Sequence, residues 1–191
     1  MKTLSDQFRV GFLGPPDTGK SSLCRALLGL EADATEKADL FGIYEKDIAV
    51  EHRSTSFKLT LLDIAGQVDY RSLAYGHTED AHVLLILVDI TKTRSWKKDT
   101  KDFLQLISDQ DKAHKRKPRP IYVVCSKIDT HTDEHLDEMN RLERTVRKHK
   151  LTLLQVSAFD GTGIEDLKSV LYAREQQIFD RNHAPRRCVL L

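Results

Sequence analysis

Residues 14–21 read Gly-Pro-Pro-Asp-Thr-Gly-Lys-Ser, and this stretch decides the fold. An alternating apolar segment, Phe8–Leu13, precedes it, and a helix-forming segment, Ser22–Leu28, follows it. The pattern G-x-x-x-x-G-K-[ST] between a strand and a helix is typical of a phosphate loop. Such a turn points backbone N–H groups inward, and the positive end of the helix favours a bound polyphosphate. An ordinary glycine turn is the alternative, which the flanking strand and helix disfavour.

The composition fits a single soluble domain. The chain has 191 residues and a net charge of +1 at pH 7, which argues against general nucleic-acid binding. Its densest apolar run, Val83–Val88, is far too short to cross a bilayer, and the amino-terminal residues lack the apolar core of a signal peptide. The three cysteines, Cys24, Cys125 and Cys188, are far apart in sequence. We therefore expect no disulfide framework and a reducing, cytoplasmic location.

Strand-like runs alternate with helical patterns along most of the chain. We expect strands at 7–13, 46–52, 57–62, 82–88, 121–125 and 151–156. We expect helices after the phosphate loop and at 95–108, 133–149 and 163–180. Several strands are apolar on both faces, as a sheet covered by helices on each side requires.

The second and third strands have no helix between them, which predicts an antiparallel hairpin on an otherwise parallel sheet. The expected fold class is therefore α/β: three layers, with a mostly parallel six-stranded sheet and helices on both faces. We assign residues 1–180 to one domain and residues 181–191 to a short basic tail.

Five basic residues lie within the segment 112–119, Lys-Ala-His-Lys-Arg-Lys-Pro-Arg, between a predicted helix and a predicted strand. A solvated loop is the favoured interpretation, and a surface for a membrane or a nucleic acid is the alternative.

A second motif, Asp63-Ile-Ala-Gly-Gln67, stands at the end of a predicted strand. A carboxylate at this place can orient a water on Mg²⁺, and Gly66 lets its backbone N–H approach a γ-phosphate. Gln67 is then placed to position an attacking water. In the phosphate loop, Lys20 would reach the outer phosphates and the Ser21 hydroxyl would bind the metal.

Two further motifs follow later strands. In Ser126-Lys-Ile-Asp129, the carboxylate is placed to accept two hydrogen bonds from a purine with an N1–H and a 2-amino group, which guanine has and adenine lacks. In Ser157-Ala-Phe159, a backbone N–H can donate to the guanine O6. Each motif alone also fits a strand-end turn with a solvated carboxylate, but their order after a phosphate loop favours base binding.

Taken in order, GPPDTGKS, DIAGQ, SKID and SAF resemble the Ras superfamily of small GTPases over essentially the whole chain. The resemblance implies a P-loop NTPase fold, GTP/GDP and Mg²⁺ as cofactors, and slow hydrolysis of GTP to GDP and phosphate. It implies Lys20 and Gln67 as catalytic residues, and Ser21 and Asp63 as metal ligands. The nucleotide-binding residues that it implies are Gly14, Asp17, Thr18, Gly19, Lys20, Ser21, Ser22, Gly66, Ser126, Lys127, Asp129, Ser157, Ala158 and Phe159.

The resemblance also implies partners. Loops near 33–44 and 64–78 would order around the γ-phosphate and contact an exchange factor, an activating protein and an effector. The partner-facing candidates are Phe41, Ile43, Tyr44 and Tyr70, for each of which packing within the hairpin is an equal alternative. Short segments resemble Rab proteins more than Rho proteins.

The last four residues, Cys188-Val-Leu-Leu191, resemble a CaaX box, and Leu191 favours geranylgeranylation of Cys188. Arg186 and Arg187 beside it suit an anionic membrane surface, although any short tail can end in apolar residues. We expect reversible attachment to the cytoplasmic face of a membrane.

The chain departs from the family pattern at several positions. Asp39 stands where the first switch has a threonine that contacts Mg²⁺. Its carboxylate could bind the metal directly, but its charge would lie close to the γ-phosphate, and Thr35 is the alternative ligand. Ala32 replaces an aromatic that covers the guanine edge, which predicts fast nucleotide release unless Phe159 stacks on the base. Pro16 removes an N–H from the phosphate loop.

These departures favour a second hypothesis, a pseudo-GTPase that holds nucleotide as a membrane-tethered interaction module. A third, a P-loop nucleotide kinase, ranks last because the motif at 126–129 gives a kinase no benefit.

Overall fold

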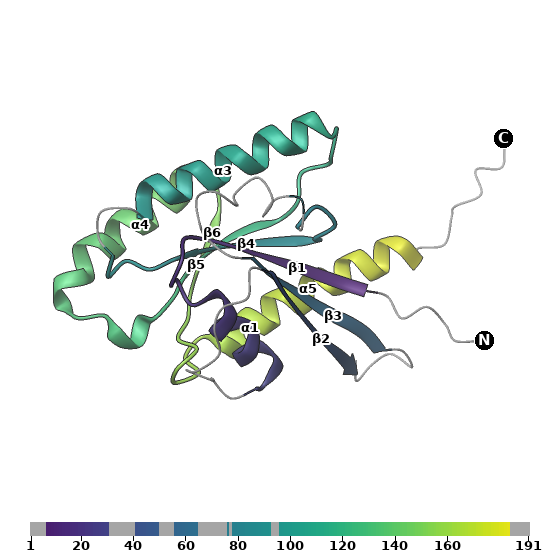
Figure 1. Cartoon of the computed structure of the whole chain (residues 1–191), viewed down its shortest axis with the longest axis horizontal. Helices are drawn as coiled ribbons and strands as arrows, with labels where there is room; N and C mark the ends of the chain where they lie inside the picture. Colours follow the sequence, from purple (N-terminus) through teal and green to yellow (C-terminus); the bar gives the residue numbers. More distant parts are fainter. Residues whose placement is uncertain are drawn as a thin grey trace.

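The computed structural model describes residues 7–30, 41–49, 56–64, 76, 78–92 and 96–183. They form a six-stranded sheet in the order β2-β3-β1-β4-β5-β6 (Figure 1). The strands are β1 (Gln7–Leu13), β2 (Phe41–Ala49), β3 (Ser56–Ile64), β4 (Val83–Val88), β5 (Ile121–Cys125) and β6 (Thr152–Gln155). The helices are α1 (Lys20–Leu28), α3 (Trp96–Ala113), α4 (Leu136–Lys148) and α5 (Ile164–His183), with short 3-10 turns at Ile128–Thr130 and Asp133–His135.

All strand pairs are parallel except β2 with β3, which is antiparallel. This pairing confirms the predicted hairpin on a parallel sheet.

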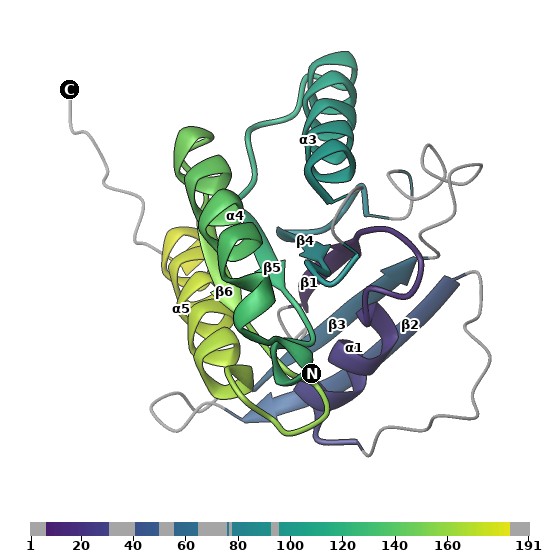
Figure 2. The same ribbon diagram turned by 90° about the vertical axis from the view of Figure 1, so that its left-hand side faces the viewer.

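The sheet is covered on both faces, as Figure 2 shows. On one face, Phe8, Val10 and Phe12 of β1 are buried in a cluster with α1 and α5. On the other face, α3 packs Phe103 and Ile107 against the sheet, and α4 adds its own apolar residues to a neighbouring cluster. Each such side chain removed from water contributes roughly 1.5–3 kcal/mol. The three-layer α/β architecture predicted from the sequence is therefore confirmed.

The centre of the sheet is β4, in which all six residues are buried. Two thiols are buried on either side of this sheet: Cys24 on α1 and Cys125 at the end of β5. Burial raises the pKa of Cys125 to about 12, and burial likewise raises the pKa of Cys24 well above its ordinary value. Neither thiol forms a disulfide, as expected from the sequence. Within the described residues, no helix is both long and apolar enough to span a membrane.

The first strand of the hairpin differs from its prediction, because β2 spans Phe41–Ala49 rather than 46–52. Backbone pairing with β3 begins at Phe41, opposite Ile64, and holds the whole segment extended. β2 is an edge strand: the apolar residues Phe41, Ile43 and Tyr44 at its start are followed by exposed Glu45, Lys46 and Asp47, so no single apolar pattern runs along the strand. Residues 41–44 therefore belong to a strand, and the predicted loop at 33–44 is wrong for its last four residues.

The helix α3 continues to Ala113, beyond the predicted end at 108. Two hydrogen bonds close it: the Lys115 N–H donates to the Lys112 carbonyl at 3.2 Å, and the Arg116 N–H donates to the Asp111 carbonyl at 2.8 Å. This is the Schellman pattern, in which the residue at the position of Lys115 is left-handed and usually glycine. Lys115 adopts that conformation, with φ of 52°.

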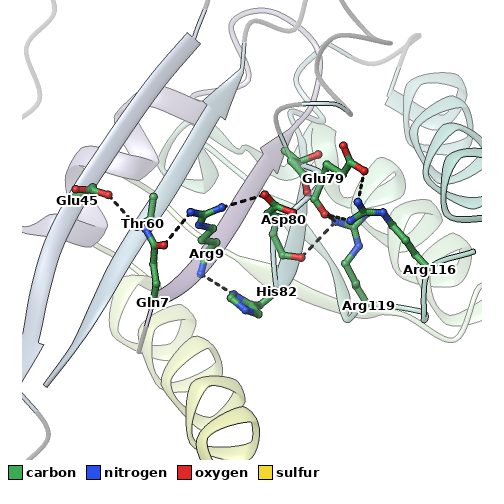
Figure 3. Close-up of polar contacts among 11 residues, drawn as sticks. Gln7, Arg9, Glu45, Thr60, Glu79, Asp80, His82, Arg116 and Arg119 are labelled. Atoms are coloured by element: carbon green, nitrogen blue, oxygen red, sulfur yellow. Dashed lines mark hydrogen bonds and ion pairs between the residues drawn. The ribbon is translucent and has the colours of Figure 1, made fainter. Parts of the chain in front are cut away.

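The segment that follows α3 is anchored rather than simply solvated. The Arg119 guanidinium donates to the carbonyls of Thr78, Glu79 and Ala81 and forms an ion pair with Asp111 at 3.0 Å (Figure 3). Its side chain is only 11% exposed. Arg116 binds both the carbonyl and the carboxylate of Glu79. The interpretation of 112–119 as a solvated loop is therefore wrong for these two arginines.

A chain of polar contacts continues along the same end of the sheet. The Arg9 guanidinium forms an ion pair with Asp80 at 3.2 Å and donates to Gln7 Oε1 at 2.9 Å (Figure 3). The Gln7 amide then donates to the Thr60 hydroxyl, which itself contacts Glu45 of the edge strand. Most of the polar groups at this end of the sheet are paired within the protein, although the buried Nε atoms of Arg116 and Arg119 have no hydrogen-bond partner among the described residues.

Candidate functional site

The predicted phosphate loop lies between β1 and α1 and has the backbone that an anion site needs. Gly14 packs so closely that a Cβ there would lie 2.8 Å from the Leu87 carbonyl oxygen, and Gly19 is left-handed with φ of 84°. The first hydrogen bond of α1 runs from the Leu23 N–H to the Gly19 carbonyl at 2.9 Å. The N–H groups of residues 20–22 before it therefore have no partner within the helix. They are available to an anion at the helix N-terminus.

The ammonium group of Lys20 is buried in this loop. Its Nζ donates to the carbonyls of Gly14 at 3.0 Å and Pro15 at 2.7 Å. Burial lowers the pKa of Lys20 to about 8, while the nearby charges of Asp63 and Asp17 act in the opposite direction. A buried cation held by carbonyl oxygens gains from added negative charge, and a phosphate oxygen would supply it.

Asp63 lies near the end of β3 and is only 6% exposed. It is close enough for its charge to act on Lys20, which begins the same helix turn as Ser21. The described residues contain no group of three or more His, Cys, Asp or Glu side chains able to hold a metal. A metal at Ser21 and Asp63 would meet a hydroxyl and a carboxylate oxygen. Oxygen donors of this kind fit Mg²⁺.

Two side chains from the end of β5 connect to the phosphate loop. The Ser126 hydroxyl contacts the Thr18 carbonyl at 2.7 Å and the Val88 carbonyl at 3.2 Å. Lys127, with φ of 58°, donates from Nζ to the Asp17 carbonyl. The serine and lysine predicted to bind nucleotide therefore connect the loop after β5 to the phosphate loop.

A cavity of about 240 Å³ opens between these loops. Its lining comes from the start of α1, the loop after β5 and the loop after β6: Gly19, Ser22, Leu23, Ser126, Lys127, Asp129, Thr130, Val156, Ala158 and Phe159. Ser157 lies fully buried behind it, and its hydroxyl accepts the N–H groups of Phe159 and Asp160 at 3.2 Å each. The two motifs predicted to read a nucleobase thus face one cavity beside the phosphate loop.

Phe159 has an unusual position for a large apolar side chain. It lines the cavity, yet it is 87% exposed. A planar ligand in the cavity would cover one face of the ring and remove apolar surface from water.

Asp89, which the motif analysis did not select, also belongs to this region. Its buried carboxylate forms an ion pair with Lys127 at 2.9 Å and accepts the N–H of Thr91 at 3.0 Å. Burial alone would raise the pKa of Asp89, but the hydrogen bonds from Thr91 and Lys127 more than offset it and lower the pKa. The available signal was a carboxylate directly after the fully apolar run at 83–88.

The exposed side of the loop carries one more charge pair. The Asp17 side chain is 81% exposed, and its carboxylate lies 3.4 Å from the Lys92 ammonium. This pair partly offsets a negative charge that would otherwise stand alone beside a bound phosphate.

Of the partner-facing candidates, Ile43 and Tyr44 are described and differ. Ile43 is 67% exposed, whereas Tyr44 packs against the main core cluster. Internal packing is therefore the right interpretation for Tyr44. Several predicted positions lie outside the described residues: Ala32, Thr35, Asp39, Gly66, Gln67, Tyr70 and Cys188, together with the side chain of Phe41.

A parallel sheet with a phosphate loop after β1 and a second cavity at the ends of β5 and β6 defines the class: an α/β protein with the P-loop GTPase fold. Comparison with known proteins narrows this class. The profile of the Ras family matches residues 9–176, so the chain belongs to the Ras family.

Individual relatives are distant. Ras-related protein Rab-26 of Rattus norvegicus is 25% identical over 175 residues, covering 88% of this chain and 63% of that protein. Ras-related protein Rab-11A of Dictyostelium discoideum is 26% identical over 160 residues, covering 83% and 71%. GTPase Obg of Aquifex aeolicus is 25% identical over 193 residues, covering 96% and 54%. The chain thus spans only about half to two-thirds of the length of Rab-26 and of the GTPase Obg proteins that it matches.

Proposed function

We propose that this chain is a small GTPase that switches between GTP-bound and GDP-bound states and hydrolyses GTP to GDP and phosphate. One observation carries the proposal: the phosphate loop and a nucleobase-sized cavity are joined by Ser126 and Lys127, so one ligand can occupy both. The names of the distant relatives, Rab proteins and GTPase Obg, support the same activity.

In this proposal, Lys20 neutralises phosphate charge, while Ser21 and Asp63 hold Mg²⁺, which stabilises the negative charge on the transferred phosphoryl group. The backbone of residues 14–19 and the first turn of α1 bind the phosphates. Gln67 orients the attacking water. Without an arginine from an activating partner, turnover is slow.

Asp129 selects guanine by accepting hydrogen bonds from its N1–H and 2-amino groups. The backbone at Ala158 donates to the guanine O6, and Phe159 stacks on the base. The exposed ring of Phe159 supports this role, since a bound base would cover it.

The alternative is a pseudo-GTPase that binds guanine nucleotide with little hydrolysis. Two features of the phosphate loop support it. Pro16 offers no N–H to a phosphate, and Asp17 places an exposed carboxylate in the loop with φ of 57°.

Titration calorimetry of the purified chain with GDP, GTP and ADP in magnesium buffer tests nucleotide binding. We expect heat with both guanine nucleotides and little with ADP; equal heat with ADP, or none with GDP, refutes the proposal.

Single-turnover hydrolysis of bound GTP then separates the GTPase from the pseudo-GTPase hypothesis. A rate that the Gln67→Leu substitution abolishes supports the GTPase, and an undetectable rate in both chains supports the pseudo-GTPase.

We further propose a Rab-like role in membrane traffic or signalling. An exchange factor, an activating protein and an effector would use residues 33–44 and 64–78, with exposed Ile43 among the contacts. Geranylgeranylated Cys188 would attach the chain reversibly to the cytoplasmic face of a membrane. Unaltered membrane partition of the Cys188→Ser variant in cells would refute the anchor.

A further inference from the structure

The end of α3 and the residues after it form a basic surface far from the phosphate loop. Of the eight residues at 112–119, five are lysine or arginine. Arg116 and Arg119 turn inward and bind the segment 78–81, as Figure 3 shows. They fix the chain in place, while Lys112, Lys115 and Lys117 remain exposed.

The acidic groups around this surface already have partners. Asp111 pairs with Arg119 at 3.0 Å, Glu79 pairs with Arg116, and Asp80 pairs with Arg9 at 3.2 Å. Asp109 accepts a hydrogen bond from the Gln105 amide. Within the part of the chain that the structure describes, no ion pair is found for the three exposed lysines. Three exposed lysines therefore lie within six residues and form no ion pair in the described part of the chain, although Asp109, whose partner is a neutral amide, keeps its negative charge nearby.

The backbone at Lys115 adds a second observation. The left-handed position that closes α3 is the place where glycine is favoured, and any L side chain there is strained. Lys115 is exposed there, so the turn that ends α3 places its charge at the surface. Here the side chain supplies the central charge of the three.

We propose that Lys112, Lys115 and Lys117 form a docking surface for the anionic headgroups of a phospholipid membrane. The end of α5 lies on the same side of the molecule as the end of α3 (Figure 1), and only four residues separate His183 from Cys188. This step rests on the prenyl anchor proposed above: a single prenyl chain gives marginal membrane binding, and a basic surface at the same end of the molecule would supply a second signal.

A membrane fits this surface better than a nucleic acid. The segment 112–119 contains no Phe, Tyr or Trp on which a base can stack, and the whole chain has a net charge of only +1. Clustered lysines near an anionic membrane each add about 1 kcal/mol of attraction, which is about fivefold in partition.

The test uses the full chain without its prenyl group and two kinds of vesicle: phosphatidylcholine alone, and phosphatidylcholine with about 30% phosphatidylserine. We expect sedimentation with the second kind only, and its loss at about 0.5 M salt. Replacing Lys112, Lys115 and Lys117 with glutamine should lower the partition on the order of 100-fold. A matched control replaces Lys97, Lys98 and Lys101, which are also exposed but belong to the other end of α3.

A single variant separates charge from structure. Lys115→Gly removes the charge and relieves the left-handed strain, so it should raise the thermal midpoint while lowering vesicle partition about fivefold. Equal losses in both triple variants, or no preference for phosphatidylserine, would overturn the proposal, as would tighter binding to a short DNA duplex than to vesicles. Calorimetry with GDP on the same variants should show no change. If the unaltered chain bound these vesicles but not GDP, only the proposed GTPase function would fail.

Discussion

Lys20 and Arg119 are two buried cations at opposite ends of the same sheet, and their partners differ. Arg119 meets three carbonyls and the carboxylate of Asp111, so its charge is balanced within the protein. Lys20 donates to two carbonyls, and burial lowers its pKa. The contrast suggests how to distinguish a structural polar group from a functional one. Arg119 meets a carboxylate at ion-pair distance, whereas the charges of Asp63 and Asp17 offset only part of the lowering of the Lys20 pKa by burial. In the proposed function, a bound phosphate supplies the remaining negative charge.

The largest effect on nucleotide affinity should come from a substitution in the cavity beside the phosphate loop. Asp129→Ala removes two charge-assisted hydrogen bonds to guanine, each worth about 1.5–3 kcal/mol. Affinity for GDP should fall roughly 10²- to 10⁴-fold, as measured by titration calorimetry. Asp133→Ala, a nearby exposed carboxylate outside the cavity lining, is the control and should bind normally. An equal loss in both variants would remove Asp129 from the site.

At the opposite end of the sheet, replacing Arg119 should lower the stability of the fold rather than the affinity for nucleotide. Arg119→Met leaves Asp111 and three carbonyls without their shared donor, which should cost about 3–5 kcal/mol and lower the melting temperature by about 10 °C. Lys20→Met should show the reverse pattern, with little loss of stability and a large loss of GDP affinity. If both variants lost stability equally, the contrast between the two cations would not hold.

The proton balance of Lys20 gives a test of intermediate size. A lowering of its pKa from 10.5 to about 8 corresponds to about 3 kcal/mol. The unfolded chain binds more protons than the folded chain between these two values, so stability relative to Lys20→Met should rise as the pH increases through this window.

Nucleotide binding should reverse this shift. Phosphate charge restores the protonated form of Lys20, so GDP should bind with uptake of about half a proton at pH 8. Calorimetry in two buffers of different ionisation enthalpy measures the uptake. In the Lys20→Arg variant the side chain stays charged throughout, so its proton uptake comes from the phosphate alone. Subtracting that uptake leaves the contribution of Lys20. Equal uptake by both chains would assign the proton elsewhere.

The smallest effect concerns the edge of the cavity. Phe159→Ala should weaken GDP binding by about 1–2 kcal/mol and speed its release, because the base loses an aromatic contact. Fluorescent GDP release measures the rate, and Phe159→Leu, which keeps an apolar side chain without the ring, is the comparison. Unchanged release from Phe159→Ala would mean that the ring stays away from the base.

The sequence predicted the six strands, the hairpin and both covered faces because the apolar runs are short, dense and separated by turn residues. The phosphate loop could be predicted because its glycines are required by the backbone conformation of a short segment, which the neighbouring residues in the sequence determine. The start of β2 could not, since an exposed edge strand is held by backbone pairing with β3 and needs no apolar pattern. Asp89 and Arg119 were also missed, because their partners lie 38 and 41 residues away in sequence.

The two core thiols have a practical consequence. Only a thiolate attacks an electrophile readily, and raised pKa values keep Cys24 and Cys125 in the thiol form at neutral pH. Both side chains are also enclosed by the packed sheet and helices. Maleimide reaction at these two positions in the native chain therefore requires the fold to open. Because Cys24 and Cys125 belong to clusters on opposite faces of the sheet, their separate labelling rates report whether the two faces open together or one at a time.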